Sequence, residues 1–393
     1  MPLRAFLLPA ATLLTDHQPH GDGLVAYGFV RELAARGHEL HVAAGRVDLR
    51  DGLPPNVHLH ALGTTSSGPP ARLGFMWRVR RLYRRLARGT TFDVVHQLTP
   101  VEVGVSLAVV DAAVPLVLGP YVPDWARSGA GADSEISAAT LPIKRGLRAA
   151  QQRRATAVLL STPAAASKVE VRSRRVRVQE LPLGIDDRIW LPTDGHDSRQ
   201  DVLFLANLEV RKGIYVLLDA FAQLAAELPD ARLIIGGGGS ELDEVRRRIR
   251  TWQASQRVEL LGHLDRDEAV AAMQRCDVYC LPSYGEPYGL SALEAMACAR
   301  PVVATDDGGL RYLVSDRSGR KVPPGDAVAL KGALREVLTD PALRRAMGEH
   351  NRRVIEERFA WPRVVDRLEG IYAEAIRESA RGHRRSRGPT RWS

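Results

Sequence analysis

Residues 283–297 read S-Y-G-E-P-Y-G-L-S-A-L-E-A-M-A and follow an apolar run, residues 278–281, that is typical of a buried strand. The glycine-bearing residues predict a loop, and the run from Leu290 onward predicts a helix that begins just after Gly289. A strand that leads through a glycine loop into a helix indicates a parallel sheet covered by helices. The N–H groups of Gly289, Leu290 and Ser291 at such a helix start form an anion site that suits a pyrophosphate.

Two glutamates flank this helix start. Leu290 and Glu294 lie one turn apart on one face, so the Glu294 carboxylate reaches a group that sits over the helix end. A carboxylate directly beside a diphosphate would repel it. The Glu294 carboxylate is therefore expected to accept hydrogen bonds from neighbouring sugar hydroxyls, and a ribose diol supplies two such hydroxyls. Glu286, on the loop, is expected to bind hydroxyls of whatever the pyrophosphate carries. A single glutamate in a helix is usually solvated, but this pair indicates a binding site.

Short apolar runs alternate with longer amphipathic stretches along the whole chain of 393 residues, which is the pattern of repeated βα units. Between Asp186 and Asp201 the chain becomes polar and carries Pro and Gly, as connections between domains do. We therefore expect two Rossmann-like, doubly wound α/β domains. The predicted parts are a first domain (1–185), a linker (186–200), a second domain (201–360), a closing helix (361–380) and a disordered basic tail (381–393).

Composition limits the class of protein. With 45% hydrophobic and 26% charged residues the chain is globular, and no run approaches the roughly 18 apolar residues of a membrane-spanning helix, so we expect a cytoplasmic protein. Cys276, Cys280 and Cys298 are expected to be buried, reduced thiols. The net charge of +9 suits nucleic acid, an anionic membrane surface or a phosphate-bearing substrate. No RNA-binding motif or zinc-finger spacing is present, so we expect no nucleic-acid partner.

The stretch from Ser283 to Gly309, with Glu286 and Glu294 eight residues apart, closely resembles the donor-binding motif of family 4 of the retaining glycosyltransferases (glycosyl transferases group 1). The resemblance covers essentially the whole chain and is strongest from Leu181 to Phe359. It implies the GT-B fold, in which two Rossmann-like domains face across a cleft. It also implies a nucleotide-diphosphate sugar as donor, a hydroxyl-bearing acceptor, and no metal or cofactor. Further matching stretches are VELLGHL at 258–264, DVYCL at 277–281 and SGRKVPPGD at 318–326.

Residues 204–213, FLANLEVRKG, resemble the strand end of this family where an Arg and a Lys clamp the donor diphosphate. Lys212 matches the lysine. Asn207 stands where the family usually has the arginine, and Arg211 is the neighbouring residue able to supply that charge. A charge-assisted contact to phosphate is worth about 1.5 to 3 kcal/mol, so the departure bears on donor affinity.

The resemblance implies front-face displacement, in which the leaving diphosphate helps to deprotonate the acceptor hydroxyl. Lys212 and the helix start before Glu294 would stabilise the growing negative charge, and Glu286 would hold the sugar. Asp265 and Asp267 look like a metal-binding pair, but Asp265 is expected to cap a helix, so we expect no metal site. The remaining residues expected at the donor are Gly237, His263, Leu264, Pro287, Tyr288, Gly289, Leu290, Ser291 and Glu294.

In the first domain, residues 20–24 (HGDGL) resemble the glycine-rich loop of the family that faces the donor phosphates and the acceptor. Gly21 and Gly23 permit close approach, and Asp22 is a candidate contact for an acceptor hydroxyl. His96 ends a strand and is a candidate catalytic or substrate contact, with a structural histidine as the alternative. Many family members carry a His after the next strand, and this chain has none there. Tyr121, the Gly119 backbone or His96 is left to make that contact.

The expected activity is therefore retaining transfer of a hexosyl group, in cell-envelope or natural-product glycoside synthesis. The acceptor is a lipid-linked glycan or a small polyol or aminocyclitol. Residues 72–88 form an Arg-rich amphipathic helix that either rests on anionic lipid, which would bring the protein to the cytoplasmic face of a membrane, or is simply solvated. The alternative function is a catalytically silent homologue that binds a nucleotide sugar, for which Asn207 is the only support. A sugar phosphorylase or a nucleotide-sugar epimerase with the same fold is the rival among enzymes, and the absence of a lysine-held cofactor signature argues against the phosphorylase.

Overall fold

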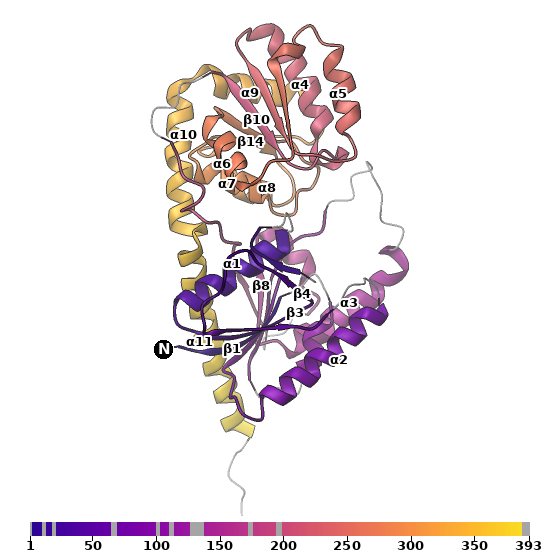
Figure 1. The fold of residues 1–393 in the computed structure, drawn as a ribbon, viewed down its shortest axis with the longest axis vertical. Helices are drawn as coiled ribbons and strands as arrows, with labels where there is room; N and C mark the ends of the chain where they lie inside the picture. The colour runs from indigo at the N-terminus through magenta and orange to yellow at the C-terminus, as the bar shows by residue number, and fades with distance from the viewer. Residues whose placement is uncertain are drawn as a thin grey trace, which may run out of the picture. The chain divides into compact units, whose positions relative to one another are not determined.

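The computed structural model describes residues 2–9, 13–17, 21–63, 69–99, 103–109, 114–125, 137–171, 176–193 and 199–386. The chain divides into two compact units (Figure 1). Unit 1 comprises Met1–Val122, Ser134–Gly184 and Trp361–Ser393, and unit 2 comprises Pro123–Asp133 and Ile185–Ala360. The C-terminal residues therefore belong to the same unit as the N-terminal ones.

Unit 1 is built on a parallel sheet with the strand order β5-β3-β1-β6-β7-β8-β9. The order runs outward in both directions from β1 and β6, as in a doubly wound fold, which confirms the predicted α/β class. The strands are β1 (Arg4–Pro9), β3 (Glu39–Ala44), β5 (Val57–Ala61), β6 (Val94–Leu98), β7 (Leu116–Tyr121), β8 (Ala157–Leu160) and β9 (Arg177–Glu180), with a separate pair β2 (Leu13–Thr15) and β4 (Arg46–Asp48). The helices are α1 (Gly21–Ala35), α2 (Pro69–Leu86), α3 (Ser137–Arg154) and α11 (Trp361–Ser386).

The helix α11 is fixed to unit 1 by apolar and polar contacts. The Trp361 ring packs edge-on against Phe29, with ring centroids 4.9 Å apart. A Cβ added at Gly28 would lie 2.0 Å from the Trp361 ring, and one at Gly184 would lie 2.3 Å from it, so both glycines make room for this side chain. Arg36 adds an ion pair to Glu369 at 2.7 Å.

The end of α11 corrects one expectation. The helix continues to Ser386, so a disordered tail beginning at Arg381 is wrong for residues 381–386. Once a packed helix exists, each further residue adds a backbone hydrogen bond at little cost, and arginine is a good helix former. The rest of the expected tail, residues 387–393, lies outside the described residues.

Unit 2 repeats the architecture with the strand order β12-β11-β10-β13-β14-β15, again parallel. Its topological switch point lies between β10 and β13, where the carboxyl ends of parallel strands form a ligand crevice in such folds. The strands are β10 (Asp201–Leu205), β11 (Arg232–Gly236), β12 (Val258–Gly262), β13 (Val278–Leu281), β14 (Val302–Thr305) and β15 (Gly319–Val322). The helices are α4 (Ile214–Glu227), α5 (Leu242–Arg250), α6 (Arg266–Arg275), α7 (Leu290–Ala297), α8 (Leu310–Leu313), α9 (Ala327–Thr339) and α10 (Pro341–Val354).

Two smaller predictions are confirmed in unit 2. Cys276, Cys280 and Cys298 are free and buried. Asp265 caps α6 in a capping box, in which its side chain accepts from the Glu268 N–H at 2.9 Å and Glu268 accepts from the Asp265 N–H at 2.8 Å. Among the helices of the described residues, none combines the length and the hydropathy needed to cross a bilayer.

Candidate donor-binding site

The loops that follow β10 and β13 are held tightly together at the switch point. Gly213, just after the turn Val210–Lys212, has φ +75°, and a Cβ there would lie 1.9 Å from the Pro282 carbonyl oxygen. Only glycine fits this position without backbone movement. The Tyr284 N–H also donates to the Arg211 carbonyl at 2.8 Å. The backbone that carries Lys212 is therefore fixed against the backbone that leads to Glu286.

This arrangement brings two of the predicted catalytic residues into direct contact. The Lys212 Nζ lies 2.7 Å from Glu286 Oε2, and only 16% and 9% of the two side chains are exposed. The Glu286 backbone is fixed as well, because its carbonyl accepts from the Gly309 N–H at 2.7 Å. A Cβ at Gly308 would lie 2.2 Å from that carbonyl oxygen, and a Cβ at Gly309 would lie 2.5 Å from the Pro287 carbonyl oxygen, which explains the paired glycines after β14.

Trp125 completes this cluster, and sequence reasoning missed it. Its ring centroid lies 4.6 Å from the Lys212 Nζ and 4.4 Å from the Arg211 guanidinium carbon. The two adjacent cations therefore both lie against the same aromatic ring, although neighbouring side chains usually diverge. The available signal was a single tryptophan in a segment otherwise poor in large side chains. Arg211 also pairs with Glu209.

The start of α7 has the expected form. The helix begins at Leu290, and its N-cap Gly289 has φ +91° and makes no side-chain capping bond. The N–H groups of Leu290 and Ser291 are in the first turn, where no intrahelical acceptor exists. The Ser291 hydroxyl lies 2.7 Å from the Tyr279 hydroxyl, which in turn donates to the Leu205 carbonyl at 3.1 Å. Buried Tyr279 thus ties the start of α7 to the end of β10.

Glu294 lies one turn into α7. Burial raises the pKa of its carboxyl to about 7, and the positive charge of Arg266 partly opposes this effect. The carboxyl is therefore close to half-protonated at neutral pH in the ligand-free protein. Arg266, at the start of α6, is a second residue that sequence reasoning did not single out, because its approach to Glu294 depends on the fold.

The other predicted donor residues lie at the same carboxyl edge. Asn207, after β10, is exposed, and its carbonyl accepts from the Glu209 N–H at 2.9 Å. Gly237, after β11, has φ +125°, and a Cβ there would lie 2.0 Å from the Ala206 carbonyl oxygen, so the local backbone already requires a glycine. His263 is exposed and Leu264 half-buried after β12, two strands from β10. Pro287 and Tyr288 lie in the loop between Glu286 and α7, and Tyr288 is buried.

A different recess of unit 2 lies at the opposite, amino edge of the sheet and is lined by Arg199, Arg232 and Arg344 among others. Arg232 pairs with Asp201 at 2.7 Å and Arg344 pairs with Asp277 at 3.5 Å. Because these two arginines already have acidic partners, the recess offers a poorer anion site than the start of α7.

In unit 1, the predicted site residue His96 lies inside the core. The side chain is fully buried, and both ring nitrogens have partners within the unit. The Nε2–H donates to the Gly119 carbonyl at 2.8 Å, so Nδ1 accepts from the Tyr372 hydroxyl at 2.6 Å. Burial also lowers the pKa of His96 to about 4, which keeps the ring neutral. In this structure His96 joins β6, β7 and α11, which favours the structural alternative over a catalytic contact.

The two other groups considered for that contact are also committed to the fold of unit 1. Tyr121 is buried in a hydrophobic cluster with Leu118 and Leu160. The Gly119 carbonyl accepts from His96 and from the Thr99 N–H. Neither offers the exposed polar group that the expected contact requires.

The predicted glycine-rich loop forms the beginning of a helix. Gly21, Asp22 and Gly23 are the first residues of α1, with Gly21 exposed and Gly23 buried. Asp22 provides negative charge in the first turn of the helix. A negative charge near the N-terminus of a helix interacts favourably with the helix dipole, which is a structural reason for an aspartate at this position. His20, the first residue of that motif, lies outside the described residues.

Comparison with known proteins identifies the family. The profile of "Glycosyl transferases group 1" matches residues 193–354, and that of "Glycosyltransferase Family 4" matches residues 20–188. The phosphatidyl-myo-inositol mannosyltransferase of Mycolicibacterium smegmatis is 31% identical over 348 residues, which cover 86% of this chain and 85% of the relative. The chain belongs to glycosyltransferase family 4. This membership confirms the resemblance carried by residues 283–309.

Other relatives of the family align over different lengths. The N-acetyl-alpha-D-glucosaminyl L-malate synthase of Bacillus anthracis is 23% identical over 92% of this chain and 96% of its own. The glycogen synthase of Mycobacterium tuberculosis is 32% identical over 198 residues, and the match spans only about half of that relative (48%).

Solved structures show the same fold. Sucrose-phosphate synthase from Thermosynechococcus elongatus superposes with a TM-score of 0.71 at 21% identity, over 96% of this chain and 100% of its own. Anabaena HepE in complex with UDP gives a TM-score of 0.72 at 20% identity, over 95% and 100% of the two chains. The fold of this family 4 member is GT-B, as expected from the sequence.

Proposed function

We propose that this family 4 member is a retaining glycosyltransferase that transfers a hexosyl group from a nucleotide-diphosphate sugar to an acceptor hydroxyl, without a metal or cofactor. The observation that carries the proposal is the Lys212–Glu286 ion pair, 2.7 Å long, in the same loop system as the uncapped start of α7. A cation and a helix N-terminus together suit a diphosphate.

The ion pair is proposed to exchange partners when the donor binds. Without donor, Glu286 neutralises the partly buried Lys212 ammonium. A diphosphate oxygen takes the place of the carboxylate as the lysine's partner, and the freed Glu286 oxygens accept hydrogen bonds from hydroxyls of the hexose. Lys212 and the first-turn N–H groups of α7 then stabilise the charge that grows on the diphosphate as the glycosidic bond breaks. Glu294 is proposed to bind the ribose diol.

Names of relatives support this chemistry without fixing the substrates. Structures of HepE have been solved with UDP and with UDP-glucose. Another relative, from Corynebacterium glutamicum, is described as GDP-mannose-dependent. Phosphatidyl-myo-inositol and L-malate in the names of relatives are hydroxyl-bearing acids. We propose that the acceptor of this protein also carries a hydroxyl group and is either a lipid-linked glycan or a small polyol or aminocyclitol.

The surface of α2 supports the lipid-linked acceptor. Leu73 and Trp77 are 66% and 61% exposed, and the Arg81 guanidinium lies 5.6 Å from the Trp77 ring centroid. Arg84 continues this exposed row on the helix, and Arg88 is exposed in the turn that follows α2. Two bare apolar side chains followed by arginines suit the interface of an anionic bilayer. We propose that the protein works in the cytoplasm and docks on the inner membrane face through this row.

The first test is calorimetry of the full chain against UDP-, GDP-, dTDP- and ADP-sugars in the presence of EDTA, followed by transfer assays with the donor that binds. Transfer to a hydroxyl acceptor with retention of the anomeric configuration, read by NMR, supports the proposal. Donor binding without turnover on any acceptor would instead indicate a silent homologue, and inversion at the anomeric carbon would overturn the mechanism.

The membrane contact has its own test. Sedimentation with vesicles containing anionic lipid is expected to carry down the wild-type chain and to fall sharply for Trp77→Ser, while neutral vesicles bind neither. Equal binding of both proteins would exclude docking through α2.

A further inference from the structure

One side-chain cluster in unit 1 is not used by the proposed reaction. Glu39 and His41 lie two residues apart on β3, and His58 and His60 lie two residues apart on β5. Residues two apart on a strand share a face, so all four side chains project from one face of the sheet. The parallel register pairs His41 with His58 directly. Two neighbouring strands therefore bring three imidazoles and a carboxylate together.

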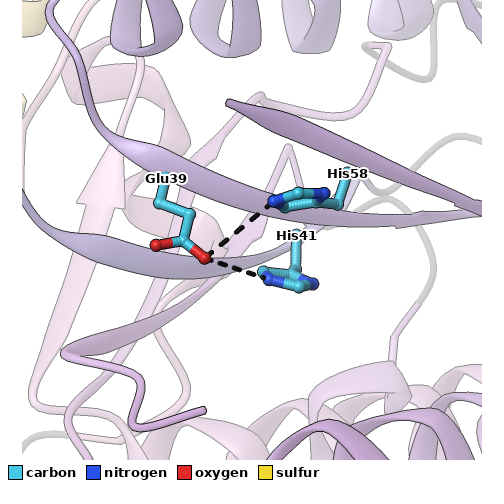
Figure 2. Close-up of side chains that lie close together, drawn as sticks. All are labelled: Glu39, His41 and His58. Atoms are coloured by element: carbon cyan, nitrogen blue, oxygen red, sulfur yellow. Dashed lines mark ion pairs between the residues drawn. The ribbon is translucent and has the colours of Figure 1, made fainter. Parts of the chain in front are cut away.

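The nitrogen and oxygen atoms converge on a small volume. Glu39 Oε1 lies 3.7 Å from His41 Nε2 and 3.9 Å from His58 Nε2, and the three ligand atoms all lie within 4.8 Å of one another. Figure 2 shows both rings turned toward the same carboxylate oxygen. These separations are too long for hydrogen bonds. Ligand atoms about 2.0 to 2.1 Å from a tetrahedral Zn²⁺ are about 3.4 Å apart, so each histidine nitrogen would approach the Glu39 oxygen by about 0.3 to 0.5 Å, and the two nitrogens would approach each other by at most about 1.4 Å.

The surroundings of the cluster match the outer shell of a metal site. Arg4 Nε donates to Glu39 Oε2 at 2.7 Å, which leaves Oε1 facing the two histidines. On the other side, His41 Nδ1 lies 3.2 Å from His60 Nε2. A hydrogen bond from Nδ1–H to His60 leaves the lone pair of His41 on Nε2, the atom that faces Glu39. A ligating histidine in proteins usually donates its second N–H to a carboxylate, a backbone carbonyl or water, and here an imidazole nitrogen takes that place; ligating carboxylates are likewise hydrogen-bonded.

Access and rigidity also suit a bound ion. His41 is buried, with 8% of its side chain exposed, while 45% of His58 remains open to solvent. An ion can therefore enter from the exposed side and keep water at its fourth position. The strands β3 and β5 are hydrogen-bonded partners, and β5 is the edge strand of the sheet. The Arg4 and Arg85 charges nearby weaken the binding of any cation, and the two imidazole ligands favour a transition-metal ion over a hard ion such as Mg²⁺.

We propose that Glu39 Oε1, His41 Nε2 and His58 Nε2 bind one divalent transition-metal ion of the Zn²⁺ type, with His60 as a positioning residue for His41. The ion fastens edge strand β5 to β3. The expectation of no metal rested on the family resemblance and on the assignment of Asp265 as a helix cap, and it did not take these histidines into account. The Glu-x-His and His-x-His pairs are each ordinary in sequence, and only strand pairing unites them. The inference does not depend on the proposed transfer reaction.

The test is calorimetric titration of Zn²⁺ into the full chain after chelator treatment and desalting. We expect one saturable equivalent. His58→Gln and Glu39→Gln should abolish it, and His60→Gln should weaken it about 10- to 100-fold, as expected for an outer-shell partner. The matched control is His350→Gln, on α10 of unit 2, which should bind as the wild type does.

Two outcomes would overturn the proposal: several weak equivalents without saturation, or equal binding by wild type and His58→Gln. A second readout guards against misfolding of the variants. Zn²⁺ should raise the Tm of the wild type and of the His350→Gln variant, because it binds only the folded state, and should leave the Tm of His58→Gln unchanged. A rise in Tm for His58→Gln equal to that of the wild type would also count against the site.

Discussion

Replacing Glu294 with glutamine should stabilise the ligand-free protein while weakening donor binding. Burial raises the pKa of this carboxyl from its usual 4.5 to about 7. At pH values well below 4.5 the group is protonated in both the folded and the unfolded chain. As the pH rises from 4.5 to 7, the unfolded chain ionises first, and the folded state loses stability. Each pH unit in that window lowers the free energy of unfolding by about 1.4 kcal/mol, so the full decrease is about 3 kcal/mol.

Glutamine has nearly the same shape as the protonated acid and carries no charge at any pH. The stability advantage of Glu294→Gln over the wild type should therefore be about 1.4 kcal/mol at pH 5.5 and about 3 kcal/mol at pH 8.5. The free energy of unfolding is measured by urea denaturation at both pH values, and donor affinity is measured by calorimetry. Comparing the two proteins at each pH cancels the titration of all other groups.

A matched variant at the same site should behave in the opposite way. Glu286→Gln removes the charged partner of Lys212, 2.7 Å away, and should lower the free energy of unfolding by about 1.5 to 3 kcal/mol at pH 8.5. The reasoning about Glu294 fails if Glu294→Gln is less stable than the wild type at pH 8.5, or if the advantage is the same at both pH values. Unchanged donor affinity in Glu294→Gln would show that the nucleotide is misplaced.

Three further variants test the loops around the site. Lys212→Met should reduce turnover by about 100-fold or more in steady-state assays, because it removes a charge that stabilises the leaving diphosphate, and near-normal turnover would exclude that role. Asn207→Arg should tighten donor binding about 10-fold in calorimetry by restoring the cation usual in the family, whereas unchanged affinity would mean that the position does not face phosphate. Gly213→Ala should lower the free energy of unfolding by about 1 to 3 kcal/mol, since its Cβ would lie 1.9 Å from the Pro282 carbonyl oxygen. The matched Gly332→Ala, in the middle of α9 with no atom within 4 Å of the added Cβ, should raise it by about 0.5 to 1 kcal/mol in the same urea assay, and equal effects of the two would contradict the packing argument.

The parts of the fold and site that the sequence predicted correctly depend on residues close together in the chain. The start of α7 at Leu290 follows from a glycine next to an apolar helical repeat. The doubly wound character of both units follows from the alternation of apolar runs with amphipathic stretches, because that alternation reflects which face of each element is buried. The Asp265 cap was also predictable, because both members of the capping box lie within four residues.

What the sequence did not predict depends on contacts between distant segments. His96 was placed at the end of a strand, but Tyr372, which covers it, comes 276 positions later. Trp125 contacts Lys212 because it belongs to unit 2, although it follows a strand of unit 1 in the sequence. A local pattern fixes which residue types lie near a strand end. It carries no information on which remote helix or loop then buries them.

The return of α11 to unit 1 has a consequence for synthesis on the ribosome. Unit 2 draws almost all of its residues from one continuous stretch, Ile185–Ala360, and its sheet is complete in the nascent chain before Trp361 is added. The first unit, although translated first, lacks the indole that fills the space beside Gly28 and Gly184 until the last tenth of the polypeptide emerges. The core of unit 1 is therefore completed after the core of unit 2. Until α11 has been synthesised, unit 1 remains incompletely packed.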